Sequence, residues 1–160
     1  MSNFSLDLSA YLAKAKGNLD AVVQTIVQEV GASLVEMSPV GKRELWAVNI
    51  DRAGRGLPPV PPGYVGGRFR ANWQASINTP SSSQFDDIDP SGQVSIDRIR
   101  NVATTANSAA GQTFYIMNNL PYAQRLENGW SQQAPSGMVG ITVVRWRGIL
   151  LDAVQSVRSK

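Results

Sequence analysis

The feature that most constrains the fold is an apolar stripe with helical spacing near the start of the chain. Across residues 8–37, apolar side chains recur at steps of three and four, with lysine, glutamine and acidic residues between them. This period places the apolar residues on one side of a helix. Gly17 and Gly31 leave a break into two helices open, and Ser38-Pro39 ends the pattern. The sequence therefore predicts a long amphipathic helix that needs a surface to pack on.

Three shorter segments are expected to form strands. Apolar residues alternate with polar ones in 44–50 and in 68–78, which is typical of a strand with one covered face. The run 113–117 is apolar and bounded by polar residues, which predicts a buried strand. These segments are far apart in the chain, so we expect a small, mostly antiparallel sheet.

Further helices are expected in the second half of the chain. Asp89-Pro90 combines a capping residue with proline at the first helical position, so a helix is predicted from there to Gly111, with Ser95 as an equal candidate for its start. Residues 122–127 are expected to form one helical turn. A last helix is expected after Ser136-Gly137, with these residues facing inward: Met138, Ile141, Val144, Ile149, Ala153, Val154 and Val157.

These elements predict one α+β domain spanning residues 1–160. Its long N-terminal amphipathic helix and its C-terminal helix would pack on the small sheet. Two segments fall outside this core. Residues 53–67 hold four of the nine prolines and five glycines, and we expect them to form a projecting arm. Residues 79–92 are polar and acidic, and we expect them to form a loop.

The residue types that are missing exclude several classes of site. The 160 residues include no cysteine and no histidine, so thiol and imidazole nucleophiles and the usual ligands of transition metals are absent. The acidic run 86–89 fits the start of a calcium loop, but Arg98 occupies the position of the required glutamate. We therefore expect no enzyme activity, no catalytic residue, no cofactor and no metal.

Basic residues are concentrated in residues 42–70, which leaves two interpretations open. With Phe69 and Trp73 nearby, the segment has the composition of a phosphate-binding arm with stacking aromatics, as in a nucleic-acid-binding accessory domain. The preferred interpretation is a strand with one packed and one solvated face, and docking on an acidic protein is a third use. The basic residues are Lys42, Arg43, Arg52, Arg55, Arg68 and Arg70.

The N-terminal segment shows neither a basic, apolar leader nor a long hydrophobic stretch. No run reaches the ~18 apolar residues that a membrane span requires. We therefore expect neither a signal peptide nor contact with a membrane.

Three sequence blocks, in order, resemble a known family. They are Ser38-Pro39-Val40 followed by GRFRANW at 67–73, NNLPYAQRLENG at 118–129, and QAPSGMV at 133–139. Together they are similar to the head–tail joining, neck or tail-completion proteins of long-tailed bacteriophages. Residues 41–66 are inserted relative to the simplest pattern of that family, so the resemblance assigns the proline arm no role.

The resemblance implies a structural role in the virion. Such proteins are small α+β domains, made in the host cytoplasm, that form a ring, commonly sixfold, between the DNA-filled head and the tail. The implied partners are further copies of the chain, the connector or head-closure proteins on the head side, and the tail terminator and tube proteins. DNA passing through the channel is a further, non-specific contact.

Within these blocks we expect two groups of structural or interface residues. The first group is a packed and partly interfacial strand, and the second surrounds the turn before the last helix. An exposed Trp130 would suit an interface, and a half-buried one the core. The residues are Arg68, Phe69, Arg70 and Trp73 in the first group, and Pro121, Tyr122, Arg125, Leu126, Glu127, Gly129 and Trp130 in the second.

Overall fold

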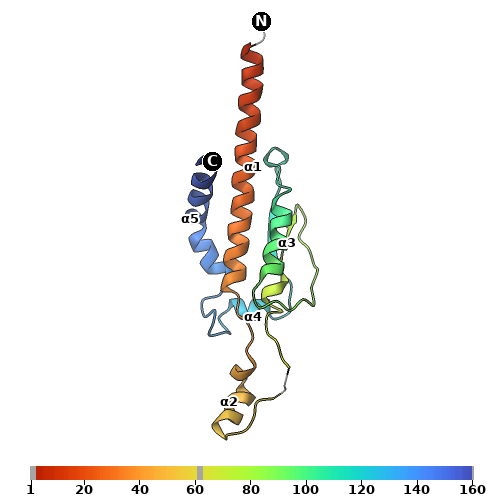
Figure 1. The fold of residues 1–160 in the computed structure, drawn as a ribbon, viewed down its shortest axis with the longest axis vertical. Helices are drawn as coiled ribbons and strands as arrows, with labels where there is room; N and C mark the ends of the chain where they lie inside the picture. The colour runs from red at the N-terminus through yellow and green to blue at the C-terminus, as the bar shows by residue number, and fades with distance from the viewer. Residues whose placement is uncertain (1–2, 61–62, 160) are drawn as a thin grey trace.

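The computed structural model describes residues 3–60 and 63–159, with side chains from Lys14 onward. One long helix, α1, runs through the molecule, and the remaining elements pack along its second half or extend beyond its end (Figure 1). In chain order the helices and strands are α1 (Asn3–Met37), the 3-10 helix η1 (Arg43–Leu45), α2 (Ala47–Gly54), η2 (Arg70–Asn72), β1 (Trp73–Ile77), α3 (Gln93–Ala103), η3 (Ser108–Ala110), β2 (Phe114–Asn118), α4 (Ala123–Glu127) and α5 (Val139–Arg158).

The body of the protein has α1 between two flanking helices. α5 lies along one side of α1 and α3 along the other, while the N-terminal part of α1 extends beyond both (Figure 1). β1 and β2 pair antiparallel, from Trp73 opposite Asn118 to Ile77 opposite Phe114. β1 also packs on α3 and α1. A 35-residue helix is about 52 Å long at 1.5 Å per residue, so α1 is much longer than the two helices that flank it.

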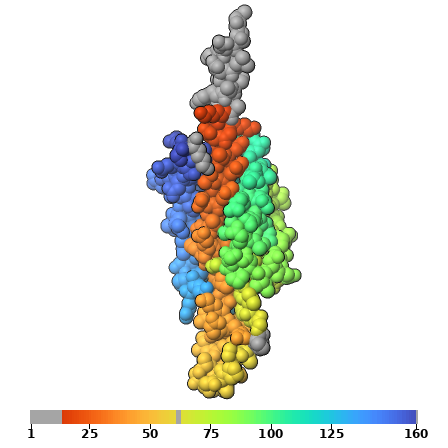
Figure 2. All heavy atoms as spheres, in the orientation of Figure 1, coloured from red at the N-terminus to blue at the C-terminus, as the bar shows by residue number. Residues whose placement is uncertain are grey.

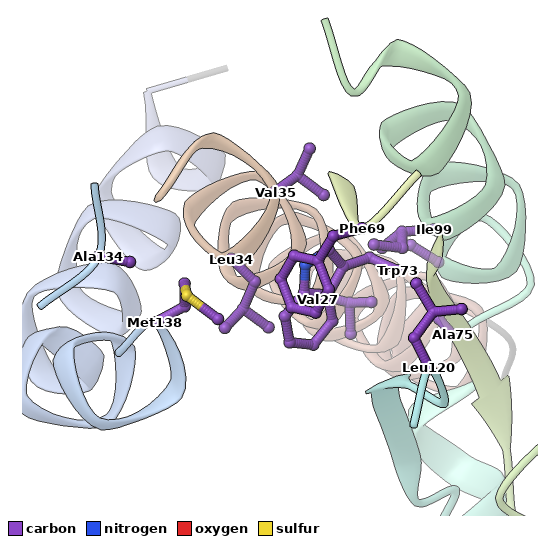
Figure 3. Close-up of a cluster of buried hydrophobic side chains, with 11 residues drawn as sticks. Val27, Leu34, Val35, Phe69, Trp73, Ala75, Ile99, Leu120, Ala134 and Met138 are labelled. Carbon is purple, nitrogen blue, oxygen red and sulfur yellow. The ribbon is translucent and has the colours of Figure 1, made fainter. Parts of the chain in front are cut away.

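The core forms where α1, α3, α5 and the hairpin converge. α1 contributes Val27, Leu34 and Val35 to it, and α3 contributes Ile99 and Ala103. The other buried apolar residues come from the β1 region and from the segments on either side of α4 (Figure 3): Phe69, Trp73, Ala75, Leu120, Ala134 and Met138. The apolar stripe of α1 is therefore used mainly near its C-terminal end.

The α+β architecture expected from the sequence is confirmed. The first helix continues through Gly17 and Gly31 without a break and ends at Ser38-Pro39. The last helix begins directly after Gly137 and Met138. The strand expected at 113–117 is β2, although its residues are half-buried where full burial was expected.

The prediction of a strand at 44–50 is wrong. These residues form η1 and the start of α2, which project beyond the end of α1 (Figure 1). The expected strand rested on the alternation of Trp46, Val48 and Ile50. Val48 and Ile50 are more than half exposed and Trp46 is only half-buried, so this alternation does not mark a covered strand face. A strand needs a partner for its backbone groups, and none of the described segments pairs with this one.

The strand expected at 68–78 is correct only for its second part. Arg68 and Phe69 lie in a turn and Arg70 begins η2, so the first arginines are outside the sheet. The helix expected to reach Gly111 ends at Ala103, and Ala110 belongs to the separate η3. Across residues 3–60 and 63–159, no helix has both the length and the apolarity for crossing a bilayer.

Candidate assembly surfaces

Glu127 fixes the start of α5. Its carboxylate accepts hydrogen bonds from the backbone N–H groups of Met138 at 2.8 Å, Val139 at 3.0 Å and Gly140 at 3.0 Å. Burial works against ionisation, but these three hydrogen bonds outweigh it and lower the pKa of Glu127. A carboxylate at this position also faces the positive end of the helix dipole. Glu127 therefore sets the turn before the last helix, as the sequence predicted.

Two glycines allow the segment before α5 to fold back close to Glu127. Gly129 and Gly137 have φ angles of +81° and +72°, which residues with a side chain rarely adopt. A Cβ at Gly129 would collide with the carbonyl oxygen of Pro135, and a Cβ at Gly137 with Glu127. The expected structural role of Gly129 is thus explained by a close approach of two backbone segments.

The other expected residues of this block lie on the surface. Trp130 is 67% exposed, and the guanidinium of Arg125 sits 3.3 Å from its ring centroid. With Pro121 and Gly129 they line an open, mixed polar and apolar hollow of about 490 Å³. Tyr122 is 38% exposed and lies beside Phe69, and burial raises its pKa. Of the two open interpretations of Trp130, the structure supports the exposed one.

Arg70 joins three segments through backbone carbonyls. Its guanidinium donates to the carbonyl oxygens of Ser38 at 2.6 Å, Glu36 at 3.1 Å and Pro90 at 2.8 Å. Next to it, the indole N–H of Trp73 donates to the Ser38 hydroxyl at 2.6 Å. The C-terminal carbonyls of α1 are thereby satisfied by a cation, as a helix end requires. Sequence analysis missed this role because nothing in the sequence places Arg70 beside Glu36.

Arg68 lies on the outside of the same region. It is exposed and pairs with Asp86 at 2.8 Å, while Arg98 pairs with Asp87 at 2.9 Å and covers the Phe85 ring. Together with the bond from Arg70 to Pro90, these contacts attach the acidic loop, residues 79–92, to the body through three arginines. Phe69 and Trp73, at 5% and 4% exposure, belong to the core.

Asp89 binds the start of α3, but it is not the N-cap residue that the sequence predicted, because Gly92 holds that position. Its carboxylate accepts hydrogen bonds from the backbone N–H groups of Ser91 and Val94, at 2.8 and 2.9 Å. Burial opposes ionisation, yet the hydrogen bonds from Ser91 and Val94 prevail and lower the pKa of Asp89. The helix itself begins three residues after Pro90, with Gly92 before its first residue.

Four of the six basic residues of 42–70 bind oxygen atoms of their own chain. Besides Arg68 and Arg70, Arg55 pairs with Asp51 at 2.5 Å, and Arg52 donates to the Pro58 carbonyl at 2.6 Å. Each of these four guanidinium groups thus binds an oxygen of its own chain. Phe69 and Trp73 are buried, so neither ring is offered to a base.

The outer face of α5 is apolar and uncovered by the described residues. Val144 is 85% exposed, Val143 66% and Leu151 59%. The expectation that Val144 faces inward is therefore wrong. α1 covers the side of α5 that carries Thr142 and Ala153, and Thr142 bonds with Ser33 of α1. The sequence could not choose between these sides because α5 carries apolar residues on both.

An apolar groove continues from this face toward the hairpin. It has a volume of about 500 Å³ and lies among α1, β2 and α5, beside Trp146, which is 47% exposed. No lining residue is charged. The lining residues are Ile26, Val27, Val30, Leu34, Phe114, Ile116, Val139, Thr142, Val143 and Trp146.

A second apolar surface is the projection, which we define as residues 42–60 and 63–66. The Asn49 side chain donates to the carbonyls of Arg43 and Val60, at 2.6 and 2.7 Å, and accepts from the Val60 N–H. The Trp46 and Tyr64 rings lie 4.8 Å apart, edge to face. Exposed apolar side chains cover it: Leu45, Val48, Ile50, Leu57, Val60, Tyr64 and Val65.

The projection extends away from the body, beyond the C-terminal end of α1 (Figure 2). Its two connecting segments touch at Gly41 and Gly66, where a Cβ on Gly66 would collide with the Gly41 carbonyl. The projection includes most of the arm that the sequence predicted at 53–67. It begins earlier in the chain, however, and includes α2.

Within the described ranges, no group of three or more His, Cys, Asp or Glu residues is arranged to hold a metal ion.

The residues that sequence analysis singled out lie either inside the body or on its surface. The body is held together by Glu127, Gly129, Arg70, Phe69 and Trp73, while Arg125 and Trp130 are on its surface.

Comparison with models of protein families, with curated proteins and with solved structures finds no match to this chain.

Proposed function

We propose that this protein is a structural subunit of the phage neck. Copies of it form a ring that joins the DNA-filled head to the tail and leaves a channel for DNA. The proposal combines the three sequence blocks that resemble neck and tail-completion proteins with the surfaces described above. Ring copies, head-side connector or head-closure proteins, and tail terminator or tube proteins are its partners.

The observation that carries this proposal is the excess of exposed surface. The chain exposes 10215 Å², whereas a compact monomer of 17.3 kDa is expected to expose ~7,800 Å². The difference, about 2,400 Å², equals three times the ~800 Å² that each partner contributes to a standard interface. Thirteen of the eighteen exposed large apolar side chains found in the described residues lie on α5 or on the projection. Such a surface is typical of an assembly subunit.

The shape of the protein suits a subunit with partners along its long axis. The N-terminal part of α1 extends from one end of the body and the projection from the other (Figure 1). In the proposed ring these two ends face the neighbouring layers of the neck, and the long sides face neighbouring copies.

The alternative, a nucleic-acid-binding accessory domain, is disfavoured by the positions of the arginines. Arg52, Arg55, Arg68 and Arg70 already bind carbonyl or carboxylate oxygens of the chain. A phosphate-binding site of this segment would have to break those contacts. Its signature would be an affinity for plain DNA that falls steeply with salt while the protein remains a monomer or dimer.

The deciding experiment is the solution mass by light scattering over a concentration and salt series. We expect a particle of fixed, ring-sized mass, commonly a hexamer, seen as closed rings by negative-stain electron microscopy. Binding to isolated phage heads, isolated tails and plain DNA is then compared. Binding to plain DNA alone, without rings and without binding to heads or tails, would reject the neck proposal in favour of the alternative.

A further inference from the structure

The two long sides of the body differ in charge and in the apolar residues that they expose. On the α5 side, Arg145 and Arg147 are exposed beside Val144. Neither arginine forms an ion pair with the described residues of its own chain. α5 as a whole carries Arg145, Arg147 and Arg158 against Asp152. This side is thus basic and apolar.

The opposite side of α1 carries α3 and the acidic loop, residues 79–92 (Figures 1 and 2). The loop contains three aspartates and no basic residue, whereas α3 adds Arg98 and Arg100 against Asp97. The Asp86 side chain is 99% exposed although it pairs with Arg68. Ile88 beside it is 56% exposed, and Val94 at the start of α3 is 39% exposed. Asp87 is paired with Arg98 and Asp97 with Arg100, so Asp86 is the carboxylate of this side that is most available to a partner.

We infer that the outer face of α5 in one copy binds the acidic-loop side of the next copy. This inference rests on the proposed ring and names its lateral contact. Apolar residues of α5, centred on Val144, would pack on Ile88 and the start of α3. Arg145 and Arg147 would approach Asp86.

The arrangement of the two sides favours a repeating contact. They lie on opposite sides of α1, so copies standing side by side in the same orientation bring unlike sides together (Figure 1). Such a heterologous contact repeats around a ring when the rotation between copies closes. A contact between two α5 faces would instead end at a dimer and bring like charges together.

The exposed area is sufficient for this contact. Two lateral contacts per copy bury ~1,600 Å² of that copy at ~800 Å² each. The excess surface of about 2,400 Å² over a compact monomer is larger than this area. The uncharged groove beside Trp146 lies at the edge of the α5 face, where it extends the apolar part of the contact.

The contact is tested by cross-linking, because the chain contains no cysteine and single-cysteine variants give one reactive position each. Val144→Cys and Ile88→Cys change exposed side chains and leave the core intact. The two variants are mixed at equal concentration and treated with a short bis-maleimide. Matched mixtures of Val144→Cys with Val48→Cys in the projection, and with Leu19→Cys on α1, use equally exposed positions.

We expect the Val144→Cys and Ile88→Cys mixture to cross-link at least tenfold more than either matched mixture. Cross-linking of Val144→Cys with itself would overturn the inference in favour of an α5-to-α5 dimer. Preferential cross-linking to Val48→Cys would assign the α5 face to the projection, and no cross-link at any concentration would reject self-contact. The solution mass separates the two proposals: rings without the expected cross-link reject only this contact, whereas the cross-link in open polymers of variable mass rejects the ring.

Discussion

At the scale of single residues, Glu127 is the clearest point at which one side chain orders a whole element. It satisfies three N–H groups at the start of α5, and α5 carries the apolar face proposed for assembly. Glu127→Gln keeps the size of the side chain but removes its charge. We expect a loss of about 0.5–2 kcal/mol in the free energy of unfolding at pH 7, measured by urea denaturation.

This effect should depend on pH in a defined direction. Because the pKa of Glu127 is lowered in the folded protein, its charge stabilises the fold above the ordinary value of 4.5 and loses that effect as the pH falls through the folded pKa. The difference between the wild type and Glu127→Gln should therefore be full at pH 6–7 and shrink below pH 4.5. Glu29→Gln, at an exposed position of α1, is the control. A difference that is constant down to pH 3 would contradict the capping role.

Trp73 and Trp130 provide a matched pair of large aromatic residues with opposite environments. Trp73 is buried and donates to the Ser38 hydroxyl, so Trp73→Ala should cost ~3–5 kcal/mol of unfolding free energy. Trp130 is mostly exposed, and Trp130→Ala should remain within about 0.5 kcal/mol of the wild type. Thermal and urea denaturation measure both variants. Equal losses would show that the exposed ring also supports the fold.

Two glycines of α1 are expected to respond to alanine in opposite directions. A Cβ at Gly31 would lie 2.7 Å from the Ile99 side chain, so Gly31→Ala should destabilise the packing of α1 on α3. No atom lies within 4 Å of a Cβ at Gly17, so Gly17→Ala should stabilise the helix by about 1 kcal/mol. Denaturation midpoints measure both changes. Stabilisation by Gly31→Ala would mean that Ile99 moves aside without loss.

These residues also show what sequence alone supplies at this scale. The structural roles of Glu127 and Gly129 were predicted, because a turn before a helix depends on nearby residues. The contacts of Arg70 with Glu36 and Ser38 were not, since they join positions more than thirty residues apart. Contacts between residues close in the chain can be predicted from the sequence. A guanidinium group can donate to any carbonyl that the fold brings near, so its distant partners cannot be predicted in this way.

At the scale of elements, periodicity predicted the long helices well and the short segments poorly. The stripe of α1 extends over many turns, so one or two glycines did not obscure it. Residues 44–50 offer only three alternating apolar positions, and a short amphipathic helix that exposes them fits the same pattern. The error has a structural cause, since the apolar side chains of the projection cover no core of their own chain.

The projection is expected to be separable from the body. Its connecting segments meet at Gly41 and Gly66, so a short Gly-Ser linker can replace residues 43–65 and close the same gap. Because the core residues lie outside this range, the variant should unfold within a few degrees of the wild type in a thermal scan. We expect it to form rings and to lose binding to either heads or tails.

Two results would contradict this separation. A large fall in the unfolding temperature would show that the projection stabilises the body, and unchanged binding to both heads and tails would remove its proposed role as an axial contact. Val48→Ser, which replaces one exposed apolar side chain of α2, is a milder variant that keeps the backbone. Its binding should weaken in the same assay.

At the scale of the whole molecule, sequence predicted the fold class and could not assign the surfaces. α5 carries hydrophobic residues on both of its sides. In the single chain, only the side with Thr142 and Ala153 is buried. If a neighbouring copy covers the rest, Val144 is an interface residue whose pattern in sequence resembles that of a core residue. The exposed apolar side of α5 is thus consistent with the proposed assembly.

The proposed assembly through α5 would make the apparent stability depend on protein concentration. A partner that binds only the folded chain raises its unfolding temperature by mass action. The wild type should therefore unfold at higher temperature as its concentration rises from about 1 to 100 μM. Val144→Asp places a carboxylate in the proposed contact and should remove this dependence while the monomer remains folded, since Val144 is 85% exposed. Val48→Asp, in the projection and therefore outside the proposed lateral contact, should retain it. Concentration dependence that survives in Val144→Asp would place the contact elsewhere on the molecule.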